Sequence, residues 1–267
     1  LAINLAGSDD QKNQWLPKIA GGECVVGVGL SEYVGAREDA GIEFLNGKLS
    51  GRSLFLIDGK NADAYLLANK SGELFLVEAS APGIEVIELT TVDKTRSSIE
   101  LILKNVDADL LSGSDDRSII EKVLDAGRIM LAADTVGAAQ VMLDKSVAYS
   151  LERKQFGRLI GSFQAVKHMC AEMAAELEPC HSMIWHAAHC FDNVPEEARL
   201  MACQTKAHIS EVGQQISKTA TEVHGGMGFT DELGLHYWFK RIGLNRQLLG
   251  SPELIREEAG RLQGFDQ

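Results

Sequence analysis

The stretch Arg153-Lys-Gln-Phe-Gly-Arg-Leu-Ile-Gly-Ser-Phe-Gln164 separates two long helical patterns. Before it, apolar or small residues recur at steps of three and four from Ile119 to Gly137, which marks one face of a helix. After it, a second helical pattern runs from about Phe163 to Phe191. Gly157 is typical of a residue that ends a helix. Two long helices joined by so short a segment predict an antiparallel helical hairpin.

Further helical patterns follow this hairpin. One begins at Pro195, a residue suited to the first turn of a helix, and runs to Val223. Another covers about 235–248, and a short last one follows Pro252. We therefore expect residues 113–267 to form an antiparallel four-helix bundle.

Residues 23–112 have the pattern of a β-domain. Short apolar runs such as Leu54–Ile57 and Ile99–Leu103 alternate with turn signals. Lys70-Ser71-Gly72 separates two of these runs in the manner of a β-hairpin. Several short strands with regular turns predict a small antiparallel β-barrel or sandwich. The expected fold class is thus α+β, a β-domain followed by a helical bundle.

The composition limits the classes of function. The chain has 267 residues, 45% of them apolar, and a formal net charge of -12. That charge argues against nucleic-acid binding, because a phosphate backbone would be repelled. No apolar run approaches the roughly 18 residues that a membrane span needs. The five cysteines are odd in number and lie mostly inside helical patterns, which indicates reduced thiols in a cytoplasmic protein.

Two segments have the residues to contact a phosphate-bearing ligand. Arg153 can give a phosphate two charge-assisted hydrogen bonds, although a basic residue at a helix C-terminus also complements the helix dipole. The run His224-Gly-Gly-Met-Gly-Phe229 allows a ligand to approach the backbone closely, although it also suits a flexible interhelical loop.

The run from Arg153 to His168 resembles the segment of the acyl-CoA dehydrogenase family in which an arginine faces a pyrophosphate. In that family a phenylalanine packs near the adenosine, a glutamine is a polar contact, and a glycine loop meets the FAD of the partner subunit. The resemblance implies FAD as the cofactor. It assigns contacts with a partner's FAD to Arg153, Phe156, Gln164, Gly225 and Gly226. Glu222 stands where a glutamine is common in the family.

Further matches extend the resemblance over most of the chain. Val28–Glu32 is similar to the family's flavin-facing strand end, and Asp125–Arg128 to the start of its first bundle helix. The family also has an N-terminal α-domain, of which only the last helix is present here, so we expect the chain to be N-terminally truncated. The expected domains are 1–22, a remnant of that domain, 23–112, the β-domain, and 113–267, the bundle.

The chain's own flavin face departs from the family pattern. The resemblance implies flavin contacts at Leu30, Ser31, Phe55 and Ile57. Ser31 keeps a hydroxyl group that can bond the flavin. Phe55 stands where a tryptophan often covers the flavin ring, and Ile57 where a threonine often bonds flavin N5.

The usual catalytic glutamate is absent. In the family, the base that removes the α-proton of the acyl-CoA occupies one of two positions, which here are Leu249 and Gly127. Neither residue can accept a proton. Asp125 and Glu253 are carboxylates in a neighbouring register and are candidate replacements. Arg128 is expected either to meet the substrate or a FAD phosphate, or to be a buried structural arginine.

The resemblance implies FAD-dependent α,β-dehydrogenation of an acyl-CoA thioester of the fatty-acid or steroid side-chain type. It also implies a homo- or hetero-tetramer, built as a dimer of dimers, with an electron-transfer flavoprotein as electron acceptor. The altered residues leave two alternatives open. One is a catalytically silent subunit that completes the FAD site of a partner in a heteromeric dehydrogenase. The other is a flavin-independent acyl-CoA-binding module, in which Arg153 and Gln164 would have no ligand to contact.

One helical pattern is crowded with histidine and cysteine. His186 and Cys190 are four residues apart, which places two metal-binding side chains on one helix face. No second pair with such spacing occurs in the sequence. We therefore expect this helix to have a polar edge and to bind no metal.

Overall fold

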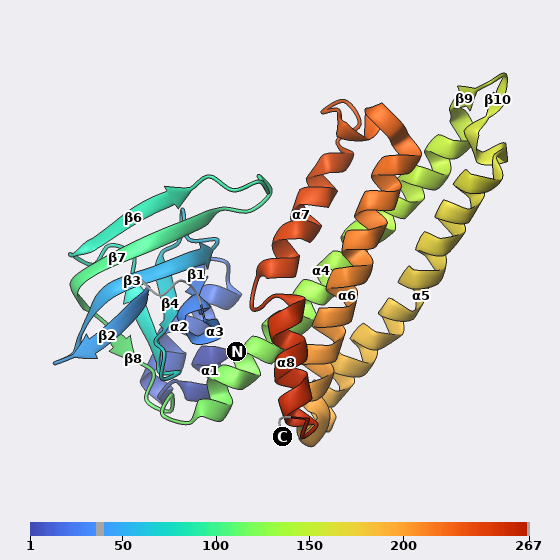
Figure 1. The fold of residues 1–267 in the computed structure, drawn as a ribbon. Coiled ribbons are helices and arrows are strands. Elements are labelled where there is room, and N and C mark those ends of the chain that lie inside the picture. The colour runs from blue at the N-terminus through green and yellow to red at the C-terminus, as the bar shows by residue number, and fades with distance from the viewer. Residues whose placement is uncertain (36–39, 266–267) are drawn as a thin grey trace. The chain divides into compact units, whose positions relative to one another are not determined.

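The computed structural model describes residues 1–35 and 40–265 (Figure 1). The chain divides into two compact units, Leu1–Leu124 and Asp125–Gln267. The long helix α4 (Arg117–Glu152) begins in the first unit and continues into the second. The domain boundaries expected after residues 22 and 112 stay predictions. In the part of the chain that the structure describes, no helix has the length and apolar character needed to cross a membrane.

The first unit begins with short helices that precede its sheet. These are α1 (Ala2–Ala6) and α2 (Asp9–Ala20), and α3 (Ser31–Val34) follows the first strand. Helix α2 begins at a capping box. The Ser8 hydroxyl oxygen accepts a hydrogen bond from the backbone N–H of Gln11, and the Gln11 side-chain oxygen accepts one from the backbone N–H of Ser8. Trp15 is the large apolar side chain that α2 buries.

The strands of the first unit form one eight-stranded sheet, in the order β6-β7-β3-β1-β4-β5-β8, with β2 paired to β3. Their bounds are β1 (Val26–Gly29), β2 (Gly41–Leu45), β3 (Lys48–Ile57), β4 (Ala64–Ala68), β5 (Leu74–Glu78), β6 (Ile84–Leu89), β7 (Ser98–Asp107) and β8 (Asp109–Leu110). Buried side chains from most of these strands form its core, and they include Leu49, Leu56, Leu67, Phe75, Ile99 and Leu101.

The α+β class, with a strand domain followed by a helical domain, is confirmed. Two details differ from the expected antiparallel barrel. The sheet is mixed, because β1 and β4 run parallel, with Val26 beside Ala64 and Gly29 beside Leu67. The sheet is also not closed in the described residues, since β6 and β8 are its two ends. An apolar run predicts a strand but not the direction of its neighbour, which depends on the path of the chain between the two strands.

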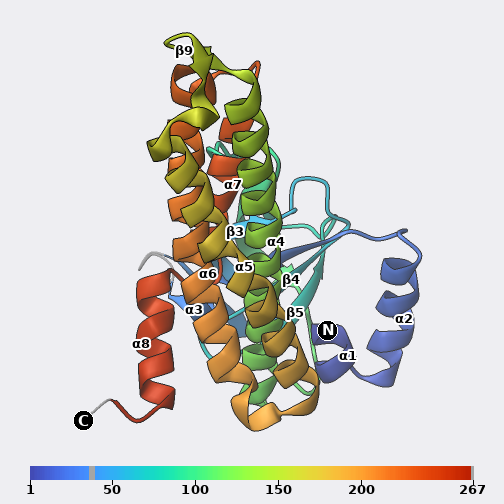
Figure 2. The same ribbon diagram turned by 90° about the vertical axis from the view of Figure 1, so that its right-hand side faces the viewer.

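The second unit is a bundle of long helices (Figure 2). After α4 it contains α5 (Gln164–Asn193), α6 (Pro195–His224), α7 (Leu235–Gln247) and α8 (Pro252–Leu262). Pro195 is in the first turn of α6, as expected. Apolar side chains from four of these helices share one core, which includes Ala139, Met142, Leu177, Ile216 and Ile242. The antiparallel arrangement buries these faces against one another.

The connection between α4 and α5 is not the simple helix stop that Gly157 suggested. Helix α4 ends at Glu152, and a hairpin of β9 (Lys154–Gln155) and β10 (Arg158–Leu159) follows it, then a short 3-10 helix, Ile160–Ser162. Phe156 has φ 53° and Gly157 has φ 76°, which is the left-handed pair that a tight two-residue hairpin turn requires. Gly157 therefore belongs to the hairpin, and the sequence signal of a glycine after a helix did not distinguish these two uses.

Candidate functional site

The hairpin between α4 and α5 forms an exposed cationic end of the bundle. Residues 153–168 contain four lysines and arginines and no acidic residue, in a chain whose net charge is -12. Arg153, Lys154, Arg158 and Lys167 are all exposed. We call residues 153–168 the cationic tip. Its local charge is opposite to that of the whole chain, which favours an anionic ligand at this place.

Aromatic side chains accompany the charges of the cationic tip. Phe156 is 92% exposed and meets the ring of Phe163 edge-on, with the ring centroids 6.1 Å apart. The guanidinium carbon of Arg158 lies 3.9 Å from the centroid of Phe163, a cation–π contact. Gln164 is exposed and its Nε2 lies 3.5 Å from Nε2 of His168. An exposed ring beside exposed cations suits a ligand that has both a planar base and phosphates.

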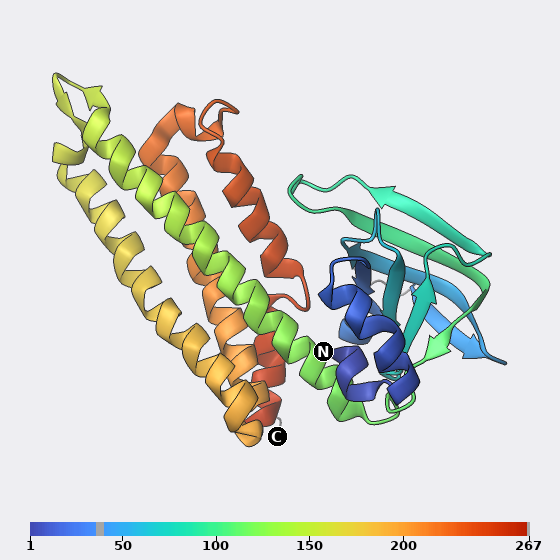
Figure 3. The same cartoon turned by 180° about the vertical axis from the view of Figure 1, so that it is seen from behind.

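The glycine loop lies at the same end of the bundle as the cationic tip (Figure 3). It forms a short 3-10 helix, Gly225–Phe229, directly after α6. The buried ring of His224 stacks on Tyr149 of α4, with the ring centroids 4.6 Å apart, four residues before Arg153. The His224 Nδ1 lies 2.7 Å from the carbonyl oxygen of Ala220, and burial lowers the pKa of His224. This stack fixes the end of α6 against the end of α4, so the two predicted FAD-binding segments come from neighbouring helix ends.

The residues at this end of the bundle fit the pyrophosphate of a dinucleotide. Gly225 has φ 58°, and a Cβ at Gly225 or Gly226 would meet no atom within 4 Å. The backbone here is therefore open to a ligand that approaches closely. Arg153 provides the cationic group, and Gln164 an amide donor and acceptor. Glu222 is also exposed, and its carboxylate opposes phosphate binding.

The predicted flavin contacts of the first unit lie around one bulge in β3. Val28 of β1 is paired with Ile57 of β3, and the register of β3 shifts between Ser53 and Leu56. Within that bulge, Phe55 has φ 54° and is 47% exposed. The Ser31 hydroxyl donates to the carbonyl of Leu54, so its proton is already used within the protein.

Leu30 and Ile57 are both less exposed than Phe55. Leu30 is buried, so its side chain belongs to the core, and only its backbone is available to a ligand. Ile57 is half-buried and apolar, and therefore offers no hydrogen bond. The structure thus brings Ser31, Phe55 and Ile57 to one region of the sheet, with few polar groups left for a flavin.

Glu32 is a buried carboxyl group in this region that was not among the predicted site residues. Its Oε1 accepts a hydrogen bond from the backbone N–H of Leu54, at 3.2 Å, so residues 31 and 32 hold both sides of Leu54. Burial raises the pKa of Glu32 to about 7, against the hydrogen bonds of Ser53 and Leu54, which lower it. In the sequence, Glu32 is a charged residue shortly after an apolar strand, and only its burial distinguishes it from an exposed loop carboxylate.

Leu249 and Gly127, where the resemblance puts the base, lie against each other in the second unit. The Leu249 side chain occupies the space in which a Cβ at Gly127 would lie. Leu249 has φ 58° and is followed by Gly250 with φ 109°, so the chain turns sharply here between α7 and α8. Neither position has a polar side chain, and the Leu249 side chain leaves no room for one at Gly127.

Arg128 is buried and makes several side-chain contacts, and its two expected uses stay predictions. Its Nη1 and Nη2 donate to the two carboxylate oxygens of Glu258 in α8, at 3.1 and 2.8 Å. Its Nε donates to the carbonyl oxygen of Leu249, at 3.2 Å. Burial alone would raise the pKa of Glu258, but the Arg128 guanidinium holds it below its ordinary value. Arg128 is 2% exposed and its donors are engaged, which favours structural support over substrate binding.

The two candidate replacement bases are also engaged. Asp125 is buried, 3.7 Å from Arg128 and 3.8 Å from Arg199. Glu253 accepts from Arg246 at 2.6 Å. Hydrogen bonds from Ser251 and the backbone, together with Arg246, lower the pKa of Glu253 to about 2, which makes it a poor proton acceptor near neutral pH.

Lys206 is a second buried residue that the sequence did not single out. It is 1% exposed in α6, and its Nζ donates to the carbonyl oxygens of Asn245 and Arg246, at 2.7 and 3.3 Å, and to Ser210 Oγ, at 3.1 Å. Burial, together with the positive charges of Arg128 and Arg246, lowers the pKa of Lys206 to about 7. It binds the C-terminal end of α7, immediately before Leu249.

Comparison with known proteins agrees with this architecture. Residues 117–262 match the family model of the acyl-CoA dehydrogenase C-terminal domain. A short-chain specific acyl-CoA dehydrogenase of Clostridium acetobutylicum is 28% identical over 273 residues, which cover 94% of this chain and 72% of that protein. The caffeyl-CoA reductase-Etf complex subunit CarC of Acetobacterium woodii is 28% identical over 252 residues, which cover 85% of this chain and 65% of that protein.

A solved structure has the same fold. It is a variant of the steroid ACAD Tcur3481-Tcur3483, with a TM-score of 0.86 and 26% identity, covering 99% of this chain and 73% of that one. The chain belongs to the acyl-CoA dehydrogenase family, a family of oxidoreductases. Members of this family are FAD flavoproteins. The chain spans about two thirds to three quarters of the length of these relatives.

Proposed function

We propose that this chain is a subunit of a FAD-dependent acyl-CoA dehydrogenase, in which it binds part of a FAD and leaves proton abstraction to another chain. The observation that carries this proposal is the packing of Leu249 against Gly127. At both positions where the family has its base, this chain has a residue that cannot accept a proton. The neighbouring carboxylates Asp125 and Glu253 are already held by arginines.

The cationic tip and the glycine loop supply the binding part of this function. The Arg153 guanidinium would bind pyrophosphate oxygens through its planar fork, and the open backbone at Gly225 and Gly226 would admit them closely. The exposed ring of Phe156 would pack against the adenosine. FAD, when bound, would supply the acceptor for the hydride that leaves the β-carbon of the acyl group. The residues of this chain would hold the cofactor in place for that transfer.

The names of the relatives support an acyl-CoA thioester as the substrate. They include a short-chain acyl-CoA dehydrogenase and a steroid ACAD, so we propose an acyl group of the fatty-acid or steroid side-chain type. The Etf complex of the CarC relative supports an electron-transfer flavoprotein as the acceptor. We also propose a cytoplasmic tetramer, a dimer of dimers, in which a second kind of subunit provides the base.

A self-sufficient dehydrogenase is the second candidate. It is favoured by Ser31, which the resemblance places at a flavin-facing strand end and which lies beside the bulge of β3. In this case, a base would have to come from a carboxylate that moves into the acyl pocket on substrate binding. The ion pairs of Asp125 and Glu253 oppose this movement.

The two candidates are separated by purifying the chain alone and together with an acyl-CoA dehydrogenase-family chain encoded beside its gene. We expect the lone chain to carry little flavin and to show no bleaching of flavin absorbance when acyl-CoA is added without oxygen. The co-purified complex should carry flavin and be bleached. Full flavin content and turnover by the lone chain would contradict the proposal. Acyl-CoA binding without flavin in both preparations would instead support a binding module.

A further inference from the structure

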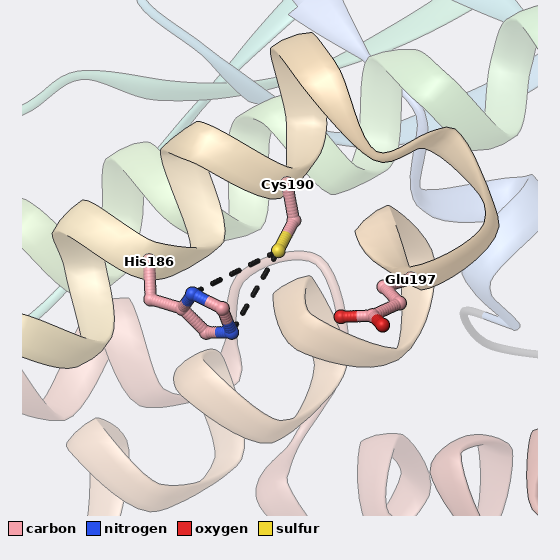
Figure 4. A group of neighbouring side chains, drawn as sticks. All are labelled: His186, Cys190 and Glu197. Atoms are coloured by element: carbon pink, nitrogen blue, oxygen red, sulfur yellow. Dashed lines mark hydrogen bonds between the residues drawn. The ribbon is translucent and has the colours of Figure 1, made fainter.

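Three side chains of the kinds that bind zinc converge where α5 meets α6. His186 and Cys190 are one helical turn apart on α5, and Glu197 lies in the first turn of α6. Their ligand atoms all lie within 4.8 Å of one another, and Figure 4 shows the three side chains around one common space. The sequence predicted no metal here because a further ligand was missing, and the turn into α6 supplies one.

The spacing of the thiol and the imidazole suits a shared ion. Cys190 Sγ lies 3.7 Å from His186 Nε2 and 3.9 Å from Nδ1. Zinc binds sulfur at about 2.3 Å and nitrogen at about 2.0 Å, and a tetrahedral angle then places the two ligand atoms about 3.6 Å apart. The pair therefore already has nearly the separation that a zinc ion between them would impose.

The backbone holds Glu197 in place relative to Cys190. Val194 is the single residue between α5 and α6. Its N–H donates to the carbonyl of Cys190 at 2.9 Å, and its own carbonyl accepts from the N–H of Glu197 at 3.0 Å. Two backbone hydrogen bonds thus connect the main chain at Glu197 to the main chain at Cys190, so little ordering of the backbone would be needed to bind an ion.

We propose that His186, Cys190 and Glu197 form a zinc site that ties α5 to α6. The imidazole nitrogen, the thiolate sulfur and a carboxylate oxygen would take three tetrahedral positions, and water the fourth. On binding, the Cys190 thiol loses its proton to solvent as the Zn–S bond forms, so the thiolate and the carboxylate together neutralise the charge of the ion. A sulfur and a nitrogen ligand exclude calcium and magnesium, which prefer oxygen.

This site is separate from the proposed FAD-binding residues. His186 is 22 residues beyond Gln164 on the same helix, which is roughly 33 Å along the helix axis. Cys190 is buried, whereas His186 and Glu197 are exposed, so the ion would lie at the surface of the bundle with its water towards solvent. Its effect would therefore be on the stability of the helix pair and not on the oxidation chemistry.

The test uses Co²⁺ as a spectroscopic substitute for zinc, with the purified, tag-free chain in the oligomer in which it is isolated. After treatment with a chelator, titration with Co²⁺ should produce the near-ultraviolet thiolate-to-cobalt band and the visible bands of tetrahedral cobalt. One equivalent of Zn²⁺ should displace the cobalt and raise Tm. Cys190→Ser should abolish the thiolate band. His186→Ala and Glu197→Gln should each weaken zinc binding by about tenfold or more, since even indirect partners of a metal ligand have effects of that size.

Matched variants separate this site from the other thiols and imidazoles of α5. His189→Ala removes a ring whose partner is Asn193, and Cys170→Ser removes a half-buried thiol elsewhere on the helix. Both should bind cobalt and zinc like the unaltered chain. The proposal is overturned if the unaltered chain shows no thiolate band, or if the band persists in Cys190→Ser. If Cys190→Ser does not fold, Glu197→Gln takes its place in the test, because the Glu197 side chain is exposed and does not contribute to the core.

Discussion

The side chain of Leu249 lies where a side chain at Gly127 would have to be. These residues are separated by more than a hundred positions, and the family resemblance predicts that one or the other is the position of the base. In this chain they form a small apolar contact, which Arg128 holds in place by donating from its Nε to the Leu249 carbonyl. A base introduced at either position would therefore stand close to the other.

Leu249→Glu should restore a proton acceptor at one of these two positions. When the isolated chain is supplied with FAD, so that no partner base contributes, we expect acyl-CoA to bleach the flavin about a hundredfold faster than with the unaltered chain if the new carboxylate acts as a general base. Leu249→Gln has the same size without the proton acceptor and should give no gain. Equal rates for the Glu and Gln variants would show that the acyl pocket, as well as the base, is missing.

The Gly127–Leu249 contact predicts a difference between two glycines of the same helix. Gly127→Ala and Gly137→Ala both replace a glycine of α4, and only at Gly127 does the new methyl group meet a side chain. We expect Gly137→Ala to raise the free energy of unfolding by about 0.5–1 kcal/mol. Gly127→Ala should lose that gain, because Leu249 must move.

Chemical denaturation of the two single variants and of Gly127→Ala in a Leu249→Ala background measures this coupling. In that background the benefit of alanine at 127 should return, since the obstructing atoms are gone. If the two glycine variants are equally stabilised in the unaltered background, then Leu249 does not pack on Gly127.

Arg153→Gln should weaken FAD retention in the assembled protein. Loss of charge-assisted hydrogen bonds to a phosphate corresponds to about 1.5–3 kcal/mol, or roughly 10- to 100-fold in the dissociation constant. Arg153→Lys should recover only part of this, because an ammonium group lacks the planar fork. Lys218→Gln removes the same charge from an exposed position of α6 and serves as the control. Flavin fluorescence on dilution provides the measurement, and equal retention by all four proteins would remove Arg153 from the site.

The sequence predicted the helices of the bundle and the segments at its cationic end, because each of these signals is local. The spacing from Ile119 to Gly137 marks a helix face, and Pro195 marks a helix start, without knowledge of the rest of the chain. The hairpin at Phe156 was missed, since a glycine after a helical pattern serves both a helix stop and a tight turn.

The features that required the structure are contacts between distant residues. The partner of Arg128 is Glu258, 130 positions away, and no local pattern indicates that pair. The parallel pairing of β1 and β4 likewise depends on the chain path between them. Glu32 and Lys206 read in the sequence as ordinary surface charges, and only their burial identifies them as groups with altered pKa values.

Lys206 should make the stability of the chain depend on pH. Burial lowers its pKa from the ordinary 10.5 to about 7 in the folded chain. Between these two values the unfolded chain binds one more proton than the folded chain, so the free energy of unfolding should rise with pH, by at most about 1.4 kcal/mol per pH unit. Below about pH 7 both states are protonated, and this contribution to the slope vanishes.

Lys206→Met removes the titrating group and should flatten the dependence of the free energy of unfolding on pH in this range. It also leaves the carbonyl oxygens of Asn245 and Arg246 without the donor Lys206 Nζ, and therefore lowers stability at every pH. Urea denaturation from about pH 6 to about pH 9 measures this slope for the unaltered chain and for Lys206→Met. The difference between the two slopes gives the contribution of Lys206, because any contribution of the cysteines is present in both proteins. Lys218→Met, at an exposed position of the same helix, should keep the slope of the unaltered chain. Parallel profiles for the unaltered chain and Lys206→Met would mean that the carbonyl oxygens at the end of α7 keep Lys206 charged throughout this range.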